Sequence, residues 1–167
     1  VTEDGIRDTV RQIMLPVWSS YYFFTLYANA ANHGDGYDAR TLRADEVPGL
    51  PQMDRYLLAR TRKLIANVTE HMDNFEISDA CDEVADFIDM LTNWYIRNTR
   101  DRFWNEDANA FNTLYTVLEA FMRVLAPLAP MEAESVWRGL TGGDSVHLGD
   151  WPYLTDPQTG VDTALGK

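Results

Sequence analysis

The chain has 167 residues, of which 46% are hydrophobic, and its formal net charge is −12. This length suits one domain that buries most of the surface an unfolded chain exposes, and the hydrophobic content excludes a disordered chain. The apolar runs fall far short of the ~20 residues that a membrane span needs, and no signal-peptide pattern opens the chain.

The first predicted helix runs from about Asp4 to Ala31, with Pro16 inside it. Its apolar residues recur at intervals of three and four, which is typical of an amphipathic helix packed on a core. Asn32-His33-Gly34 is expected to end the helix. Residues 34–52 contain glycines and prolines but no periodicity, so we expect a long connection across the surface.

Two longer helical patterns follow this connection. The second predicted helix runs from about Met53 to Asn74, and the third from about Ser78 to Phe103. Ser78 can cap the third helix, and the acidic residues of its first turns suit the positive end of the helix dipole. The single cysteine, Cys81, excludes disulfides and thiolate metal clusters, and it fits the buried stripe as a small apolar residue.

The last two predicted helices are separated by prolines. The fourth runs from about Ala108 to Ala126 and is stopped by Pro127. Pro130 can open the fifth, and Gly142-Gly143 closes it. The aromatic and methionine residues of these helices are expected to form core. Because no strand pattern stands out, we predict an all-α fold, an antiparallel bundle of about five helices.

The predicted domain organisation is simple. Residues 1–152 form the helical bundle, and residues 153–167 are rich in turn formers, which favours a loosely ordered tail or the start of a linker. The chain begins with Val1 rather than methionine and stops without a capping motif. We therefore expect it to be a piece excised from a longer protein.

Positive charge is concentrated in two segments of this acidic chain, residues 54–63 and 93–104. Together they hold seven basic residues against two acidic ones, and the rest of the chain is strongly acidic. An acidic body argues against a general nucleic-acid binder, because nonspecific affinity comes from neutralised phosphates. A narrow basic seam is compatible with these charges, but the sequence does not show whether the two segments meet.

Residues 93–104 are the candidate functional stretch, with three arginines and two tryptophans. In a helix, Asn93, Arg97, Arg100 and Trp104 share one stripe, at i, i+4, i+7 and i+11. Guanidinium groups match phosphate oxygens, and guanidinium and indole planes stack on unpaired bases. The structural alternative is that arginines near a helix C-terminus complement the dipole while their stems cover apolar surface. Both interpretations remain open at this point.

The sequence shows no catalytic or cofactor-binding pattern. The three histidines have no ligand spacing, and no nucleophile–base pair or glycine-rich phosphate loop is present. We therefore predict no catalytic residue, no cofactor and no metal in this chain.

Four segments in register resemble one family. They are the stretch 93–104, the segment Leu15–Phe24 continued by Tyr27-Ala28-Asn29, the segment Leu125–Met131, and the closing motif Ser145–Pro152. They resemble the anticodon-binding helical domain of class Ia aminoacyl-tRNA synthetases, in the isoleucyl-tRNA synthetase branch. The resemblance covers roughly residues 6–152.

The choice of the isoleucyl branch over the valyl branch rests on a few residues. An acidic residue commonly follows Trp-Tyr-Ile in the valyl relatives, whereas Arg97 follows it here. Two positions depart from the isoleucyl pattern. Ser19-Ser20 stands where many relatives have Asn-Ala, and Asn98-Thr99 interrupts a run of arginines.

The resemblance implies a cytoplasmic protein that binds the anticodon stem-loop of tRNA(Ile) and joins the rest of the synthetase chain. The parent would charge tRNA with isoleucine using ATP and Mg²⁺. With only two lysines, this chain cannot contain the family's lysine-rich ATP loop. Asn93 would contact a base or sugar, Arg97, Arg100 and Arg102 phosphates or bases, and Trp94 or Trp104 would stack on a base. Trp94 and Arg102 lie off the stripe, and Trp94 is expected to be buried.

Two alternatives stand beside this interpretation. The chain could be the equivalent domain of a valyl enzyme. It could also be a helical protein-interaction or scaffold module without a nucleic-acid role, which the acidic bulk and the dipole explanation of the arginines would fit.

Overall fold

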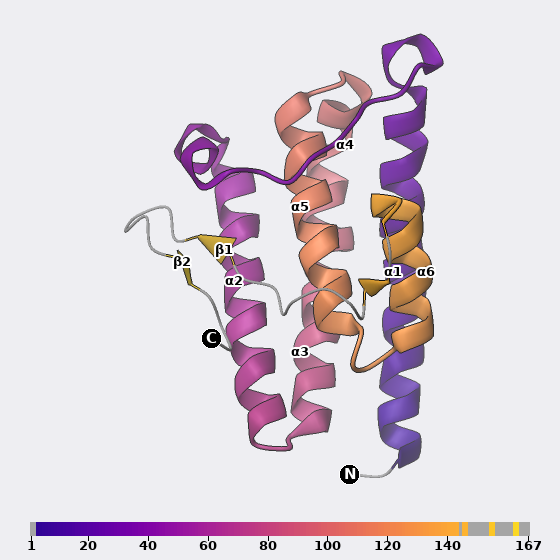
Figure 1. Cartoon of the computed structure of the whole chain (residues 1–167), viewed down its shortest axis with the longest axis vertical. Helices are drawn as coiled ribbons and strands as arrows, with labels where there is room; N and C mark the ends of the chain where they lie inside the picture. Colours follow the sequence, from indigo (N-terminus) through magenta and orange to yellow (C-terminus); the bar gives the residue numbers. More distant parts are fainter. Residues whose placement is uncertain (1–2, 144, 147–153, 156–161, 164–167) are drawn as a thin grey trace.

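Helices make up most of the computed structural model, which describes residues 3–143, 145–146, 154–155 and 162–163 (Figure 1). This confirms the all-α class, and each of the five predicted helices has a counterpart. The helices are α1 (Glu3–Ala30), α2 (Gln52–Asp73), α3 (Ile77–Met90), the π-helical η3 (Leu91–Ile96), α4 (Arg97–Trp104), α5 (Ala108–Leu125) and α6 (Pro130–Thr141), with short 3₁₀ turns η1 (Asn32–Gly34) and η2 (Ala44–Gly49).

The third predicted helix is one rod with three parts. Leu91, Ile96 and Arg97 keep right-handed helical dihedral angles, so α3, η3 and α4 continue into one another without a break. α1 and α2 both pack against this rod, and α2 runs in the opposite direction to it (Figure 1). The rod lies behind α5 in this view, which places its outward face on the side of the molecule turned away from the viewer.

Helix α5 forms the centre of the bundle, and most of its side chains are buried. Two of its buried polar residues, Asn112 and Thr116, have partners in the predicted surface connection, which crosses in front of α5 in Figure 1. The backbone N–H of Arg40 donates to Asn112 Oδ1 (3.1 Å), and that of Leu42 donates to Thr116 Oγ1 (2.8 Å). Buried amide and hydroxyl groups need such partners, so these bonds fix the path of the connection.

Proline and glycine mark the two ends of α6, as the sequence predicts. Pro130 occupies its first turn, and Gly142 caps it with a positive φ of 66°, a conformation that glycine adopts without strain. Asp107 caps α5 by accepting a hydrogen bond from the Asn109 N–H (2.9 Å).

The π-helical segment is the feature that the sequence analysis did not predict, since residues 78–103 were expected to form a uniform α-helix. Side chains supply hydrogen bonds to carbonyl groups in and around it. Asn98 Nδ2 donates to the Trp94 carbonyl (2.7 Å), Thr99 Oγ1 to that of Tyr95 (2.6 Å) and Thr92 Oγ1 to that of Ile88 (3.0 Å). A π turn changes the rotation between the side chains before and after it, and such turns are frequent at functional sites.

The end of the chain is described only in part. Two short strands, β1 (Leu154–Thr155) and β2 (Asp162–Thr163), pair antiparallel, with Leu154 opposite Thr163; the sequence analysis predicted no strand here. Of the closing motif, Ser145 and Val146 are described, and Val146 belongs to the core. Residues 147–152 lie outside the described residues, so the division between 152 and 153 stays a prediction. None of the described helices is both long and apolar enough to span a bilayer.

Candidate nucleic-acid interface

The predicted stripe lies on the outward face of the rod, where Asn93, Arg97, Arg100 and Trp104 are all exposed. The Trp104 side chain is 76% exposed. Within the part of the chain that the structure describes, the Arg97 guanidinium has no ion-pair or hydrogen-bond partner. The Arg100 guanidinium lies over the Phe23 ring of α1, 5.5 Å from its centroid, and likewise pairs with no described carboxylate. Two cations and an indole are therefore presented to solvent along one helix face. We call these four residues the outward stripe.

The side-chain amide of Asn93 already makes one hydrogen bond as a donor. Its Nδ2 donates to Asp89 Oδ1 (2.7 Å), one helical turn earlier. This bond fixes the orientation of the amide and leaves its carbonyl oxygen available to accept a hydrogen bond from a base or a ribose.

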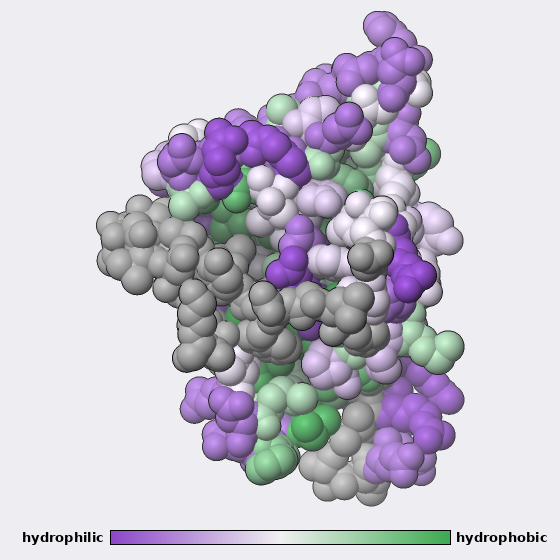
Figure 2. All heavy atoms as spheres, viewed as in Figure 1, coloured by the Kyte–Doolittle hydropathy of each residue, from purple (hydrophilic) through white to green (hydrophobic). Residues whose placement is uncertain are grey.

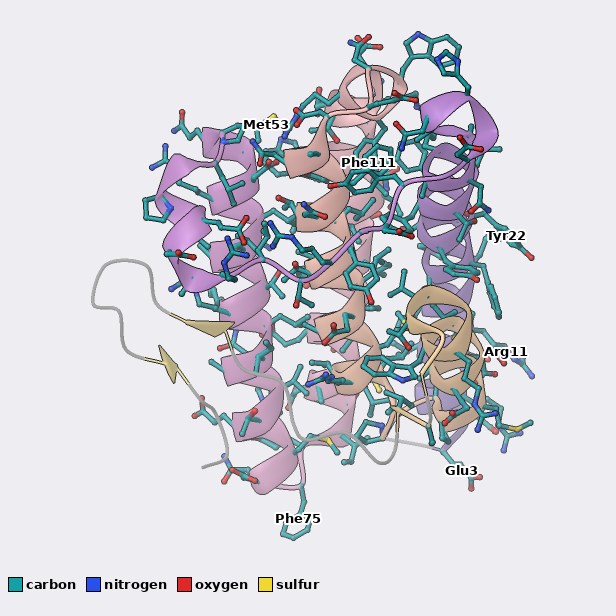
Figure 3. All side chains as sticks on the ribbon, turned by 45° about the horizontal axis from the view of Figure 1, so that its top comes forward. Glu3, Arg11, Tyr22, Met53, Phe75 and Phe111 are labelled. Atoms are coloured by element: carbon teal, nitrogen blue, oxygen red, sulfur yellow. The ribbon has the colours of Figure 1, made fainter. Side chains whose placement is uncertain are left out.

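Phe103 holds the end of the stripe in place from inside the bundle. Its ring contacts Phe23 of α1 edge-to-face (centroids 5.0 Å apart) and Phe111 of α5 in the same way (5.4 Å). Figure 3 shows Phe111 within the bundle, whereas Tyr22 projects away from α1. This aromatic cluster fixes the last turn of α4, so the neighbouring Trp104 extends from a rigid base.

Arg102 lies on the other side of α4, and its guanidinium forms ion pairs within the bundle. Its Nη1 and Nη2 donate to the two oxygens of Asp54 (2.7 Å each), and its Nε donates to Asp107 (2.9 Å). Asp54 is fully buried and also accepts a hydrogen bond from the Tyr95 hydroxyl (2.7 Å). The sequence analysis placed Arg102 among the phosphate contacts, but its guanidinium instead joins α2, η3, α4 and the start of α5.

Two members of this network, Arg102 and Tyr95, have shifted pKa values. The hydrogen bond to Asp54 raises the pKa of the Arg102 guanidinium above its ordinary value. Burial, reinforced by the charge of Asp54, raises the pKa of the Tyr95 hydroxyl. Arg102 therefore stays charged and Tyr95 stays protonated, which makes the network a permanent support for the outward stripe.

The two basic segments meet at Trp94, which the structure places in a partly buried position. Its ring lies edge-on to Tyr56 of α2, with the centroids 5.2 Å apart. Arg60 donates from Nη1 to the Tyr56 hydroxyl (3.0 Å), and its guanidinium lies over the same ring. A cavity of about 390 Å³ opens beside these rings; we call it the Trp94 cavity, and its lining residues are Gln52, Met53, Tyr56, Met90 and Trp94.

A second hollow lies between the ends of α1 and α4. Its volume is about 450 Å³, and Leu26, Tyr27 and Trp104 are among its lining residues. Glu106 lies at the same place, and its carboxylate accepts a hydrogen bond from the Asn32 N–H (2.7 Å). This hollow gives the exposed Trp104 ring an apolar neighbourhood at the end of the outward stripe.

Sequence reasoning missed the α2 side of this surface. Gln52 and Met53 lie in the first turn of α2, where the sequence shows an ordinary helix start, and Figure 3 shows Met53 at this end of the helix. The available signal was Tyr56, an aromatic residue inside the basic segment 54–63. Ser20, the second residue of the Ser19-Ser20 pair that stands where many relatives have Asn-Ala, is buried and donates to the Pro16 carbonyl (2.9 Å).

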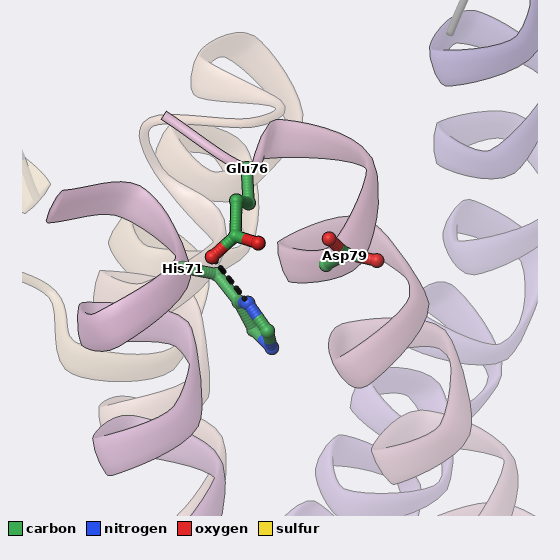
Figure 4. Close-up of side chains that lie close together, drawn as sticks. All are labelled: His71, Glu76 and Asp79. Atoms are coloured by element: carbon green, nitrogen blue, oxygen red, sulfur yellow. Dashed lines mark hydrogen bonds and ion pairs between the residues drawn. The ribbon is translucent and has the colours of Figure 1, made fainter. Parts of the chain in front are cut away.

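A separate charged cluster lies at the turn between α2 and α3 (Figure 4). His71, Glu76 and Asp79 each have a possible metal-ligand atom, all within 4.8 Å of one another. His71 Nδ1 lies 3.4 Å from Glu76 Oε1, and His71 Nε2 lies 3.9 Å from Glu83 Oε1. Exposed acidic groups of this kind commonly gather without an ion, and these contacts are those of a hairpin that joins two helices. The cluster is at the opposite end of α2 from the Trp94 cavity.

The face seen in Figure 1 is different from the outward face of the rod. Hydrophilic residues gather over η2, at the upper left of the view (Figure 2). Arg40 and Glu46 form a two-bond ion pair there, with distances of 2.7 and 2.8 Å. The charge of Arg40 is therefore paired with a neighbouring carboxylate, in contrast to those of Arg97 and Arg100.

Comparison with known proteins gives the family of the chain. A family model described as the anticodon-binding domain of tRNA ligase matches residues 54–165. The isoleucine–tRNA ligase of Bifidobacterium longum is 79% identical over all of this chain, which spans 15% of that protein. The isoleucine–tRNA ligases of Leifsonia xyli and Mycobacterium tuberculosis are 50% and 48% identical over 91% of the chain, which spans 13% and 14% of their lengths. Since the family model matches well over half of the sequence, this chain belongs to the family of anticodon-binding domains of tRNA ligases.

Proposed function

We propose that this chain is the anticodon-binding part of an isoleucine–tRNA ligase and that its outward stripe contacts the anticodon stem-loop of tRNA(Ile). The observation that carries the proposal is the exposure of Arg97 and Arg100 without carboxylate partners among the described residues, in a chain whose net charge is −12. The relatives named isoleucine–tRNA ligase support the choice of substrate.

Each residue of the stripe has a distinct task in this proposal. Arg97 and Arg100 bind loop phosphates through their guanidinium forks, and Trp104 stacks on an unpaired base, a contact worth about 1–3 kcal/mol. The carbonyl oxygen of Asn93 accepts a hydrogen bond from a base edge, which single-stranded loops leave open. Arg102 acts indirectly, by positioning the rod through Asp54.

The chemistry belongs to the rest of the proposed ligase. There, ATP and Mg²⁺ serve the activation of isoleucine, in the cytoplasm where tRNA is charged. This chain contributes binding energy and recognition, and the remaining ligase chain and tRNA(Ile) are its partners.

The test uses the complete ligase with Arg97→Ala and Arg100→Ala. We expect each substitution to raise the KM for tRNA in aminoacylation by about tenfold, the order expected for a lost charge-assisted contact of about 1.4 kcal/mol. Isoleucine-dependent ATP–pyrophosphate exchange should stay unchanged, because it needs no tRNA. Arg11→Ala, at an exposed arginine of α1, is the matched control. Normal aminoacylation by both stripe variants would refute the role of the stripe.

A protein-interaction module is the second candidate function, and one observation favours it. Leu15, Tyr22 and Leu26 are 75%, 64% and 67% exposed on α1, at spacings that place them on one side of the helix. A module that uses this face would bind its partner with little dependence on salt, and Arg97→Ala would leave that binding unchanged.

A further inference from the structure

We infer that the Trp94 cavity receives one unpaired base of the anticodon loop, at a place separate from the Trp104 ring. This inference rests on the proposed function and adds a second base-binding position to it. It assigns Gln52, Met53 and Tyr56 of α2 to the RNA-binding surface, together with Met90 and Trp94 of the rod.

The walls of the cavity suit a flat aromatic ligand. The Trp94 and Tyr56 rings stand at 73° to each other, so they form a corner in which a planar ring can contact one ring by its face and the other by its edge. Met53 and Met90 complete the lining, and unbranched thioethers adapt to a planar guest. A volume of about 390 Å³ provides room for one nucleobase and its ribose.

The rim offers hydrogen bonds for a base edge. Gln52 is exposed, and in the described part of the chain its side-chain amide has no hydrogen-bond partner. An amide donates and accepts at once, which is what the Watson–Crick edge of a base requires. Gln52 can therefore bind the edge of a base whose faces lie against the rings.

The surrounding charges favour a nucleotide over an apolar protein side chain. Arg60 is held at the cavity by its bond to the Tyr56 hydroxyl, and Arg97 follows Trp94 by about one turn of the rod. Of the two carboxylates next to lining residues in the sequence, Asp54 is paired with the Arg102 cation, and Asp89 accepts a hydrogen bond from the neutral amide of Asn93. On its other side, Arg60 lies with Glu83 and Asp86 around a separate hollow. Two cations beside an apolar cavity are suited to a base with its phosphate.

The π-helical segment carries Trp94, one wall of the cavity. It places Trp94 toward α2 while Asn93 and Arg97 stay on the outward face. The Asn98 side chain holds the Trp94 carbonyl (2.7 Å), which fixes the backbone at the ring. A loop whose phosphates lie on Arg97 and Arg100 can thus direct one base toward Trp104 and another into the Trp94 cavity.

The experiment is a coupling scan with the complete ligase. Anticodon stem-loop RNAs, each with one abasic nucleotide in the loop, are titrated against the unchanged enzyme and against Trp94→Ala and Gln52→Ala. At one loop position, we expect the abasic change to weaken binding of the unchanged enzyme by about tenfold, the order of a lost base stack. The same change should have no effect on the affinity of Trp94→Ala, and a reduced effect on that of Gln52→Ala. Trp104→Ala is the matched control and should keep the full penalty at that position.

The outcomes separate the two proposals. If Arg97→Ala weakens RNA binding but no loop position couples to Trp94 or Gln52, the cavity is not a base site and the proposed function stands. If Arg97→Ala and Arg100→Ala both leave RNA affinity unchanged, the role of the outward stripe is refuted, and the inference that rests on it fails as well. Trp94→Phe keeps an aromatic wall and should retain most of the coupling, and Gln52→Ala alters an exposed side chain, so a folding defect of Trp94→Ala leaves the inference testable.

Discussion

The two parts of the α3–η3–α4 rod, α3 and the part from residue 93 onward, expose side chains of opposite charge. In α3, Asp79, Asp82, Asp86 and Asp89 are all exposed. Beyond residue 92, the exposed residues of the outward stripe are an amide, two guanidiniums and an indole. At the proposed interface, an RNA phosphate would be repelled by the aspartates of α3 and attracted by Arg97 and Arg100, so the acidic part would restrict where RNA can bind.

The helix dipole does not explain this change of sign by itself. Its effect falls off within the last turn of a helix. Arg97 lies seven residues before Trp104, the last residue of α4, and is therefore about two turns from the end. A purely structural arginine would pair with a carboxylate, whereas Arg97 pairs with none of the described carboxylates. The contrast with Arg102, which has three bonds to carboxylates, shows that one short helix carries both kinds of arginine.

The largest expected effect concerns this contrast between arginines. Arg102→Ala leaves Asp54 buried without its main partner, and breaking a buried ion pair in this way costs about 3–5 kcal/mol of unfolding free energy. Arg97→Ala removes an exposed side chain and should change stability by less than about 0.5 kcal/mol. Urea unfolding of the chain measures both. Equal losses for the two variants would contradict the division between structural and exposed arginines.

The second largest effect is expected for Trp104, whose indole lies at the end of the outward stripe. Trp104→Ala should weaken binding of the anticodon stem-loop by about tenfold, because a base stack of about 1–3 kcal/mol is lost. Trp104→Phe should recover part of the affinity. Tyr22→Ala, at an exposed aromatic residue of α1, serves as the control in the same fluorescence titration. An identical affinity for Trp104→Ala and the unchanged protein would remove Trp104 from the interface.

A smaller effect is expected at the π-helical segment η3, which joins α3 to α4. Asn98→Ala removes the hydrogen bond to the Trp94 carbonyl, and because water can replace it at this exposed position, the loss of stability should be about 0.5–1 kcal/mol. Asn109→Ala, at an exposed asparagine near the start of α5, is the control. If thermal unfolding shows the same change for both variants, Asn98 does not support the π-helical segment.

The smallest effect lies away from the rod, in the connection at η2. Hydrogen bonds from Arg40 and from the Arg43 backbone lower the pKa of Glu46 to about 2. A lowered carboxyl pKa stabilises the folded state above the ordinary pKa of about 4.5, and this contribution is lost as the pH falls toward 2. Glu46→Gln should lower Tm by roughly 1–2 °C at pH 7.

The same variant provides its own pH control. The melting curves of Glu46→Gln and the unchanged chain should converge as the pH falls from about 4.5 to about 2. RNA affinity should be unaffected at pH 7, since η2 does not contribute to the outward stripe. A Tm difference that persists at pH 2 would mean that Glu46 acts through packing rather than through its charge.

Local signals in the sequence were sufficient for the five predicted helices and for the stripe, but not for the π-helical segment. Pro130 and Gly142 mark the bounds of α6, and the spacing of Asn93, Arg97 and Trp104 placed them on one exposed face. Long-range packing could not be predicted in the same way. The partner of Arg102 is 48 residues away, and the Trp94 cavity depends on how α2 meets η3. Asn98 and Thr99 interrupted the arginine run, and their bonds to backbone carbonyls show that they serve the π-helical segment instead.

The most direct test of the outward stripe is the salt dependence of anticodon stem-loop binding by the complete ligase. Two phosphate contacts to single-stranded RNA account for about −1.4 in the slope of log affinity against log salt concentration. We predict that Arg97→Ala combined with Arg100→Ala makes the slope less negative by about this amount, while Arg11→Ala leaves it unchanged. The same slope for the double variant and the unchanged enzyme would contradict the account.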